Sequence, residues 1–191
     1  MAFEEKAISE FKRLWRSTKS LHVRFGTLDE LTVVATLDYV NQEYGEVMQA
    51  QLMGDEDNLR EELVDLAVTV MGLCMAKGIK WDDLRYHLVF FLDDMPTYKT
   101  PIYWHRLGSV RAQLESSCLF PTFFQGGDAF ASELLSLIAY YFRDDMTYFT
   151  SNVQIVARKN GAKTDASHQV VNGQIKRRVA TAINPELYNH E

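Results

Sequence analysis

The chain has 191 residues, of which 47% are hydrophobic and 24% are charged, a composition typical of a globular protein with a sizeable core. Its net charge of −6 argues against binding to duplex nucleic acid, which requires a basic surface, and is compatible with acids that bound cations neutralise. No apolar run reaches the roughly 18 residues that cross a bilayer, and the acidic, amphipathic start is unlike a secretory signal, so we expect a cytoplasmic protein without a membrane partner.

Hydrophobic periodicity predicts helices separated by short loops, and therefore the all-α class. The expected helices cover residues 3–17, 28–53, 58–77, 82–93, 101–120, 128–143 and 144–161. Residues 1–165 are expected to form a single helical domain, either as one bundle or as two repeats over residues 28–97 and 98–165. The polar tail, residues 166–191, either forms a short hairpin around Asn172-Gly173 or wraps the surface.

Helix ends can be predicted from capping residues. Thr27, with Glu30 as its capping-box partner, is expected to begin the second helix, and Asp57 is expected to begin the third. Lys77 and Gly78 are expected to end the third helix, since glycine adopts the left-handed conformation without strain. A four-three spacing along the third helix predicts a stripe packed in a bundle, formed by Leu59, Leu63, Leu66, Val70 and Leu73.

Two pairs of carboxylates lie beside the apolar positions of consecutive helices. Residues three apart are neighbours on one helix face, so Glu43 and Glu46 form one pair. Glu62 and Asp65 form the other, and antiparallel packing of the two helices would make the pairs face each other. Four anions in one space repel unless hard divalent cations lie between them, which favours Mg²⁺, with Mn²⁺ as the alternative ion. The competing interpretation is four solvated surface acids.

The stretch "EYGE" at residues 43–46, followed by "ELVDLAVTVMGLCMAKGI" at residues 62–79, resembles the ExxE…ExxD signature of the MazG-like, all-α nucleoside triphosphate pyrophosphohydrolases. That superfamily includes dimeric dUTPases and dCTPases and the phosphoribosyl-ATP pyrophosphohydrolases. The resemblance covers residues 28–85. It implies a MazG-type helical bundle that hydrolyses a (d)NTP to (d)NMP and pyrophosphate, with Mg²⁺ held by Glu43, Glu46, Glu62 and Asp65. The chain departs from the family at Gln42, where an acid is common.

The family usually places an Asn and a Lys or Arg, which hold the substrate phosphates, on the helix that follows "GI". The corresponding stretch here, "WDDLRYHLVFFLDD", carries no such pair. Asn160 and Lys163 in "VQIVARKNGAKTD" resemble this N-x-x-K element, and Arg158 and Lys159 are adjacent. By resemblance, these four residues are the substrate-binding set, with Asn160 hydrogen-bonded to a phosphate or ribose oxygen.

A shift of 71 positions aligns the two expected repeats. It places Glu62 on Glu133 and Asp65 on Ser136, so the acids are complete only in the first repeat, whereas the N-x-x-K element exists only in the second. We therefore hypothesise a fused pseudo-dimer in which each half keeps one side of a single active site. The alternative is a plain helical extension whose basic end is stabilised by the helix dipole.

The implied mechanism assigns three catalytic residues. Glu62 or Glu46 would orient or deprotonate the attacking water, and Lys163, with a neighbouring cation, would offset the negative charge on the pyrophosphate leaving group. The family implies a homo-oligomer, dimeric or tetrameric, and the duplication offers a monomeric pseudo-dimer instead. The second functional hypothesis is a non-catalytic helical interaction or regulatory module that has kept the fold.

Overall fold

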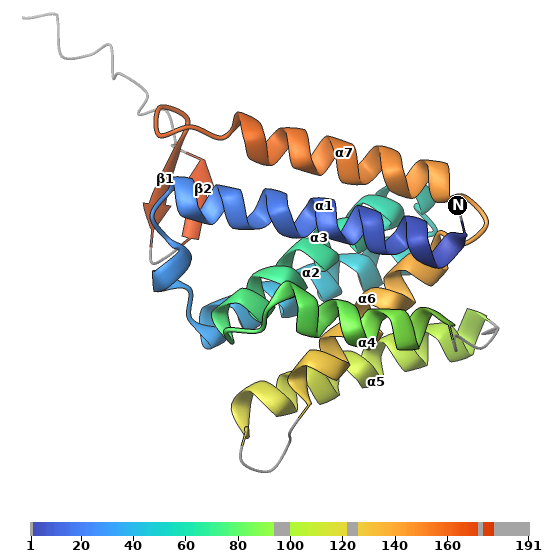
Figure 1. The fold of residues 1–191 in the computed structure, drawn as a ribbon. Helices are drawn as coiled ribbons and strands as arrows, with labels where there is room; N and C mark the ends of the chain where they lie inside the picture. The colour runs from blue at the N-terminus through green and yellow to red at the C-terminus, as the bar shows by residue number, and fades with distance from the viewer. Residues whose placement is uncertain (1, 94–99, 122–125, 172–173, 178–191) are drawn as a thin grey trace, which may run out of the picture.

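The computed structural model describes residues 2–93, 100–121, 126–171 and 174–177, and this part of the chain is an all-α bundle, as predicted (Figure 1). A short 3₁₀ helix and one β-hairpin complete it. The helices are α1 (Phe3–Arg24), α2 (Val33–Met53), α3 (Glu56–Ala76), α4 (Trp81–Asp93), α5 (Thr100–Leu119), α6 (Gly127–Tyr141) and α7 (Met146–Ala162). The remaining elements are η1 (Leu28–Glu30), β1 (His168–Val171) and β2 (Gln174–Arg177).

Helix α1 is longer than its sequence predicted. It continues past Ser17 for two further turns and ends at Arg24, with Phe25 as its C-cap, after which Gly26 adopts a left-handed φ of 65°. The extension is stabilised because Thr18 and Leu21 continue the buried face of the helix. The longer helix brings its C-terminal turn against the end of α7, where it contributes to the site described below.

The prediction that Thr27 caps α2 was wrong. Thr27 precedes η1, and the residue that caps α2 is Thr32, whose Oγ1 accepts a hydrogen bond from the Ala35 backbone N–H. An N-cap requires extended backbone, which Thr32 has (φ −103°, ψ 144°) and Thr27 lacks (φ −97°, ψ −1°). The chain therefore makes one tight turn before α2 begins.

Helices α2 and α3 form an antiparallel hairpin joined by a two-residue turn. Gly54 ends α2 with a φ of 68°, and Asp55, rather than the predicted Asp57, caps α3 by accepting from the Asn58 N–H. The predicted apolar stripe is confirmed, since Leu59, Leu63, Leu66, Val70 and Leu73 are all buried. Each such side chain contributes about 1.5–3 kcal/mol on burial, so the stripe fixes which face of α3 the acids can use.

The third helix of each predicted repeat packs on the other repeat. Helix α4 contacts α6, α7 contacts α3, and α3 contacts α6. Helix α1 lies beside α7 along the upper side of the bundle in Figure 1. This exchange has the form that a fused pseudo-dimer would produce, and the duplication of residues 28–97 and 98–165 stays a prediction.

The predicted C-terminal tail contains ordered structure next to the bundle. Strands β1 and β2 pair antiparallel, with His168 opposite Arg177, and the hairpin lies near the C-terminal ends of α1 and α7 (Figure 1). The turn expected at Asn172-Gly173 falls outside the described residues. Across the described part of the chain, none of the helices has the length and apolar character needed to cross a bilayer.

Candidate metal and nucleotide site

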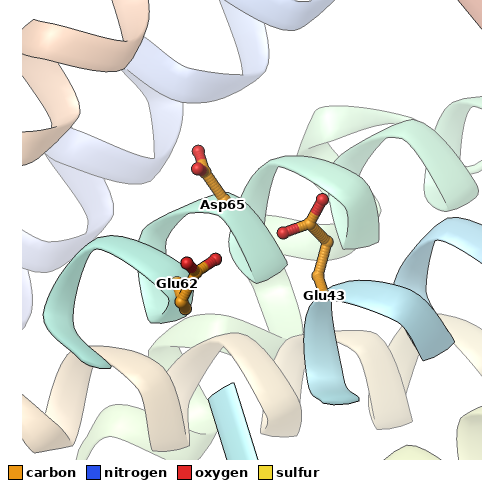
Figure 2. A group of neighbouring side chains, drawn as sticks. All are labelled: Glu43, Glu62 and Asp65. Atoms are coloured by element: carbon orange, nitrogen blue, oxygen red, sulfur yellow. The ribbon is translucent and has the colours of Figure 1, made fainter. Parts of the chain in front are cut away.

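The predicted carboxylates of the α2–α3 hairpin come together in one place. Glu43 extends from α2, and Glu62 and Asp65 extend from adjacent turns of α3 into the same space (Figure 2). One carboxylate oxygen from each residue lies within 4.8 Å of the others. The three-residue spacing on α3 and the antiparallel hairpin produce this arrangement, as the sequence predicted.

Glu46, the fourth predicted ligand, lies at the edge of this cluster. Its carboxyl is within hydrogen-bonding reach of Glu62, and its charge acts on the other three acids. Gln42 donates to Glu46 Oε1 at 3.0 Å, so the residue that departs from the family pattern orients a predicted ligand. All four predicted carboxylates therefore lie near one another, with Glu46 outside the close group of Glu43, Glu62 and Asp65.

Burial and mutual repulsion raise the pKa values of Glu43, Glu62 and Asp65. Burial raises the pKa of Glu43 to about 7, and the charges of Asp65, Glu46 and Glu62 add to the effect. Burial also raises the pKa of Glu62, followed by repulsion from Glu46 and Asp65. Burial raises the pKa of Asp65 as well, while Lys159 and Lys163 partly oppose the increase. The cluster is thus costly to ionise without further positive charge.

The donor set fits a hard divalent cation. Glu43, Glu62 and Asp65 form no salt bridge with any Lys or Arg in the described ranges. Closely spaced carboxylate oxygens without a salt bridge are the ligands that Mg²⁺ and Mn²⁺ prefer, and the half-buried position leaves room for water or phosphate oxygens. These residues would hold the metal that the family implies.

The N-x-x-K element of α7 reaches the same cavity as the acids. A partly open cavity of about 530 Å³, bordered mainly by α1, α2, α3 and α7, is lined by Glu43 and Asp65 and also by Asn160 and Lys163. Burial lowers the pKa of Lys163, while the opposite charge of Asp65 acts to raise it. Residues from the two predicted repeats therefore share one cavity.

Two of the predicted substrate-binding residues lie farther out. Lys159 is exposed, although its charge acts on Asp65. Arg158 is exposed and donates to the Gln154 carbonyl on its own helix at 3.4 Å. Neither side chain lines the cavity, so the structure separates Asn160 and Lys163 from the other two basic residues.

Helix α1 contributes residues to the site that the sequence analysis missed. Arg24 donates to the carbonyls of Asn160 and Gly161 at 2.6 and 2.9 Å, which anchors the end of α7. Thr18 and His22 line the cavity. The available signal was a polar residue, Thr18, at a position where the helical period requires an apolar one.

Comparison with known proteins agrees with this part of the molecule. Residues 22–89 match the family model described as phosphoribosyl-ATP pyrophosphohydrolase. The match contains η1, α2, α3 and most of α4, and therefore all four acids. The comparisons with curated proteins and with solved structures found no match.

Proposed function

Residues 22–89 belong to the MazG-like, all-α nucleoside triphosphate pyrophosphohydrolase superfamily, and from this membership we propose that the protein is a Mg²⁺-dependent enzyme that converts a (d)NTP to (d)NMP and pyrophosphate. The membership supports a pyrophosphohydrolase-type activity on nucleotides. The observation that carries the finer proposal is the cavity itself. Glu43 and Asp65, which form no salt bridge with a described Lys or Arg, line it together with Lys163, so carboxylates suited to cations and an ammonium group suited to phosphate face the same space.

Glu43, Glu46, Glu62 and Asp65 would hold the metal. When bound, it would lower the pKa of a coordinated water and neutralise phosphate oxygens. The partly buried position of the acids limits competition from bulk water, which strengthens every electrostatic contact in the site.

The chain's own residues would then manage charge and protons. Glu62 or Glu46 accepts a proton from the water that attacks the α–β phosphoanhydride, and the carboxyl–carboxyl contact between them suits one shared proton. As the bridging P–O bond breaks, the leaving pyrophosphate gains negative charge. Lys163 offsets that charge, with Lys159 adding a weaker, more exposed positive charge.

The test is pyrophosphate release from a panel of the standard (d)NTPs and phosphoribosyl-ATP, with Mg²⁺ and with EDTA. We expect release from at least one nucleotide with Mg²⁺ and none with EDTA. Absence of release from every nucleotide would contradict the proposal and favour the non-catalytic helical module.

A further inference from the structure

The shared cavity extends well beyond the acids. Its volume of about 530 Å³ lies within the range of about 300–1,000 Å³ that is usual for small-molecule sites. Much of its wall is apolar, formed by Leu21, Leu31, Val68, Val156 and Ile175. A charged triphosphate gains nothing from contact with an apolar wall, whereas the flat faces of a nucleobase can pack against it.

Two buried polar atoms in this cavity lack partners. Thr18 is 2% exposed and Asn160 is 5% exposed, and neither Thr18 Oγ1 nor Asn160 Nδ2 has a hydrogen-bond partner within the described ranges. A buried polar group without a partner costs about 1–3 kcal/mol, and such groups are rare in native proteins. Both residues line the cavity, which makes a bound ligand the candidate partner for these two atoms.

Other threonines in the same cavity show what is unusual about Thr18. Thr36 Oγ1 donates to the Thr32 carbonyl at 2.8 Å, and Thr69 Oγ1 donates to the Leu66 carbonyl at 2.9 Å. Helical threonines commonly satisfy their hydroxyls in this way. Thr18 does not, although it lies within α1 with carbonyls of the preceding turn nearby.

Tyr39 supplies an aromatic surface in the cavity. It lies four residues before Glu43, hence one turn away on the same face of α2, and both side chains line the cavity. Its ring makes no contact with another ring in the described part of the chain. Stacking of a base on an aromatic ring stabilises binding by about 1–3 kcal/mol.

We propose that this cavity binds the nucleoside part of the substrate, with the base between apolar walls and with Thr18 and Asn160 hydrogen-bonded to the polar atoms of the nucleoside. The inference rests on the proposed function, which places the triphosphate at the acids. Thr18 lies outside the family match at residues 22–89, so selectivity among bases is assigned to the N-terminal helix of this chain. A buried group that pairs with one base rejects a base that leaves it unpaired.

The experiment measures equilibrium binding, because binding does not depend on turnover. Calorimetric titration with the nucleoside monophosphates, and with ribose 5-phosphate as a base-free probe, would compare wild type, Thr18→Val and Thr150→Val, a control on α7 outside the cavity. Both substitutions replace a hydroxyl with a methyl group of similar size, but only Thr18 has an unpartnered hydroxyl, because Thr150 Oγ1 donates to the Met146 carbonyl at 2.9 Å. We expect Thr18→Val to weaken the preferred nucleotide about three- to tenfold and to reduce discrimination among bases. Thr150→Val should change binding by less than about twofold, and neither variant should alter binding of ribose 5-phosphate.

Each outcome decides between the two proposals. Equal binding by Thr18→Val and wild type, or no nucleotide binding by folded wild type, would overturn the nucleoside pocket. Preserved base-selective binding without any pyrophosphate release would contradict hydrolysis and leave the pocket standing. Thermal unfolding of both variants would establish that they remain folded.

Discussion

The two helical hairpins of the bundle handle their acids in opposite ways. In α2–α3, Glu43, Glu62 and Asp65 face one another without a salt bridge to any described Lys or Arg. In α5–α6, the buried Glu133 accepts a hydrogen bond from Arg106 Nε at 2.7 Å. Both hairpins thus carry carboxylates, but an arginine of the same hairpin neutralises the acid only in α5–α6.

The difference separates an acid that is paired within the protein from acids that we propose bind a metal. A buried carboxylate needs a counter-charge, and in α5–α6 the protein provides it with a guanidinium of the neighbouring helix. Glu115 on α5 is likewise paired, with Arg111 at 2.7 Å. In α2–α3 no salt bridge from a described Lys or Arg neutralises the three acids, although the charges of Lys159 and Lys163 act on Asp65. We therefore expect protons or metal ions to supply the remaining positive charge. The comparison predicts that replacing an acid by its amide lowers activity in α2–α3 and lowers stability in α5–α6.

The largest effect is expected for activity in α2–α3. Asp65→Asn, or Glu46→Gln, should lower Mg²⁺-dependent pyrophosphate release by about 10³-fold or more, because the metal loses a charged ligand. The fold should remain intact by circular dichroism. Glu133→Gln is the matched control on α6 and should retain turnover. Wild-type-like rates in either α2–α3 variant would contradict the metal assignment.

For the free energy of unfolding, we expect the larger effect in α5–α6. Glu133→Gln should lower the free energy of unfolding by about 1–3 kcal/mol, because it weakens a buried, charge-assisted hydrogen bond and leaves Arg106 without its counter-charge. Urea denaturation measures the change. Asp38→Asn, an exposed substitution on α2, should change it by less than about 0.5 kcal/mol. A Glu133 variant as stable as wild type would remove the distinction between the hairpins.

Lys163→Ala tests the cation that α7 supplies to the cavity. We expect KM for the triphosphate to rise about tenfold and kcat to fall as well, because the lysine binds phosphate in the ground state and offsets the leaving-group charge in the transition state. Arg158→Ala should have a smaller effect, since that side chain is exposed and bonded to its own helix. Steady-state kinetics give both values, and an unchanged KM and kcat in Lys163→Ala would exclude the residue from the site.

The smallest effect concerns pH and the protons held by α2–α3. The pKa of Glu43 is raised from 4.5 to about 7 in the folded protein, so the folded state binds this proton more tightly than the unfolded state does. Its contribution to stability is therefore fully present below about pH 4.5 and is lost as the pH rises through about 7. Because Glu43 is only half-buried, we expect this contribution to be below about 1 kcal/mol.

Thermal unfolding in EDTA across this pH range measures the contribution of Glu43. Glu43→Gln should show a smaller loss of stability with rising pH than wild type, because the glutamine does not titrate. Addition of Mg²⁺ at pH 7 should raise the melting temperature of wild type more than that of Glu43→Gln. Parallel pH profiles for the two proteins would contradict the assigned repulsion.

Local sequence patterns were sufficient for the acids and for much of the core. The three-residue spacing of Glu62 and Asp65, and their position beside the stripe that includes Leu63 and Leu66, depend only on helical geometry. The choice between two capping threonines was not local. Thr27 and Thr32 have the same side chain, and the 3₁₀ turn between them decided which one begins α2. The homo-oligomer and the cytoplasmic location stay predictions of the sequence.

The sequence by itself thus determined the helical class and the four carboxylates, because periodicity within one helix fixes which side chains are neighbours. Only the tertiary structure decided that α1 and α7 close the cavity. Arg24 meets the carbonyl of Asn160 across 136 positions of the chain, and Thr18 reaches the cavity from a helix outside the family match. Such contacts depend on how whole helices pack, and no repeat of 3.6 residues encodes that packing.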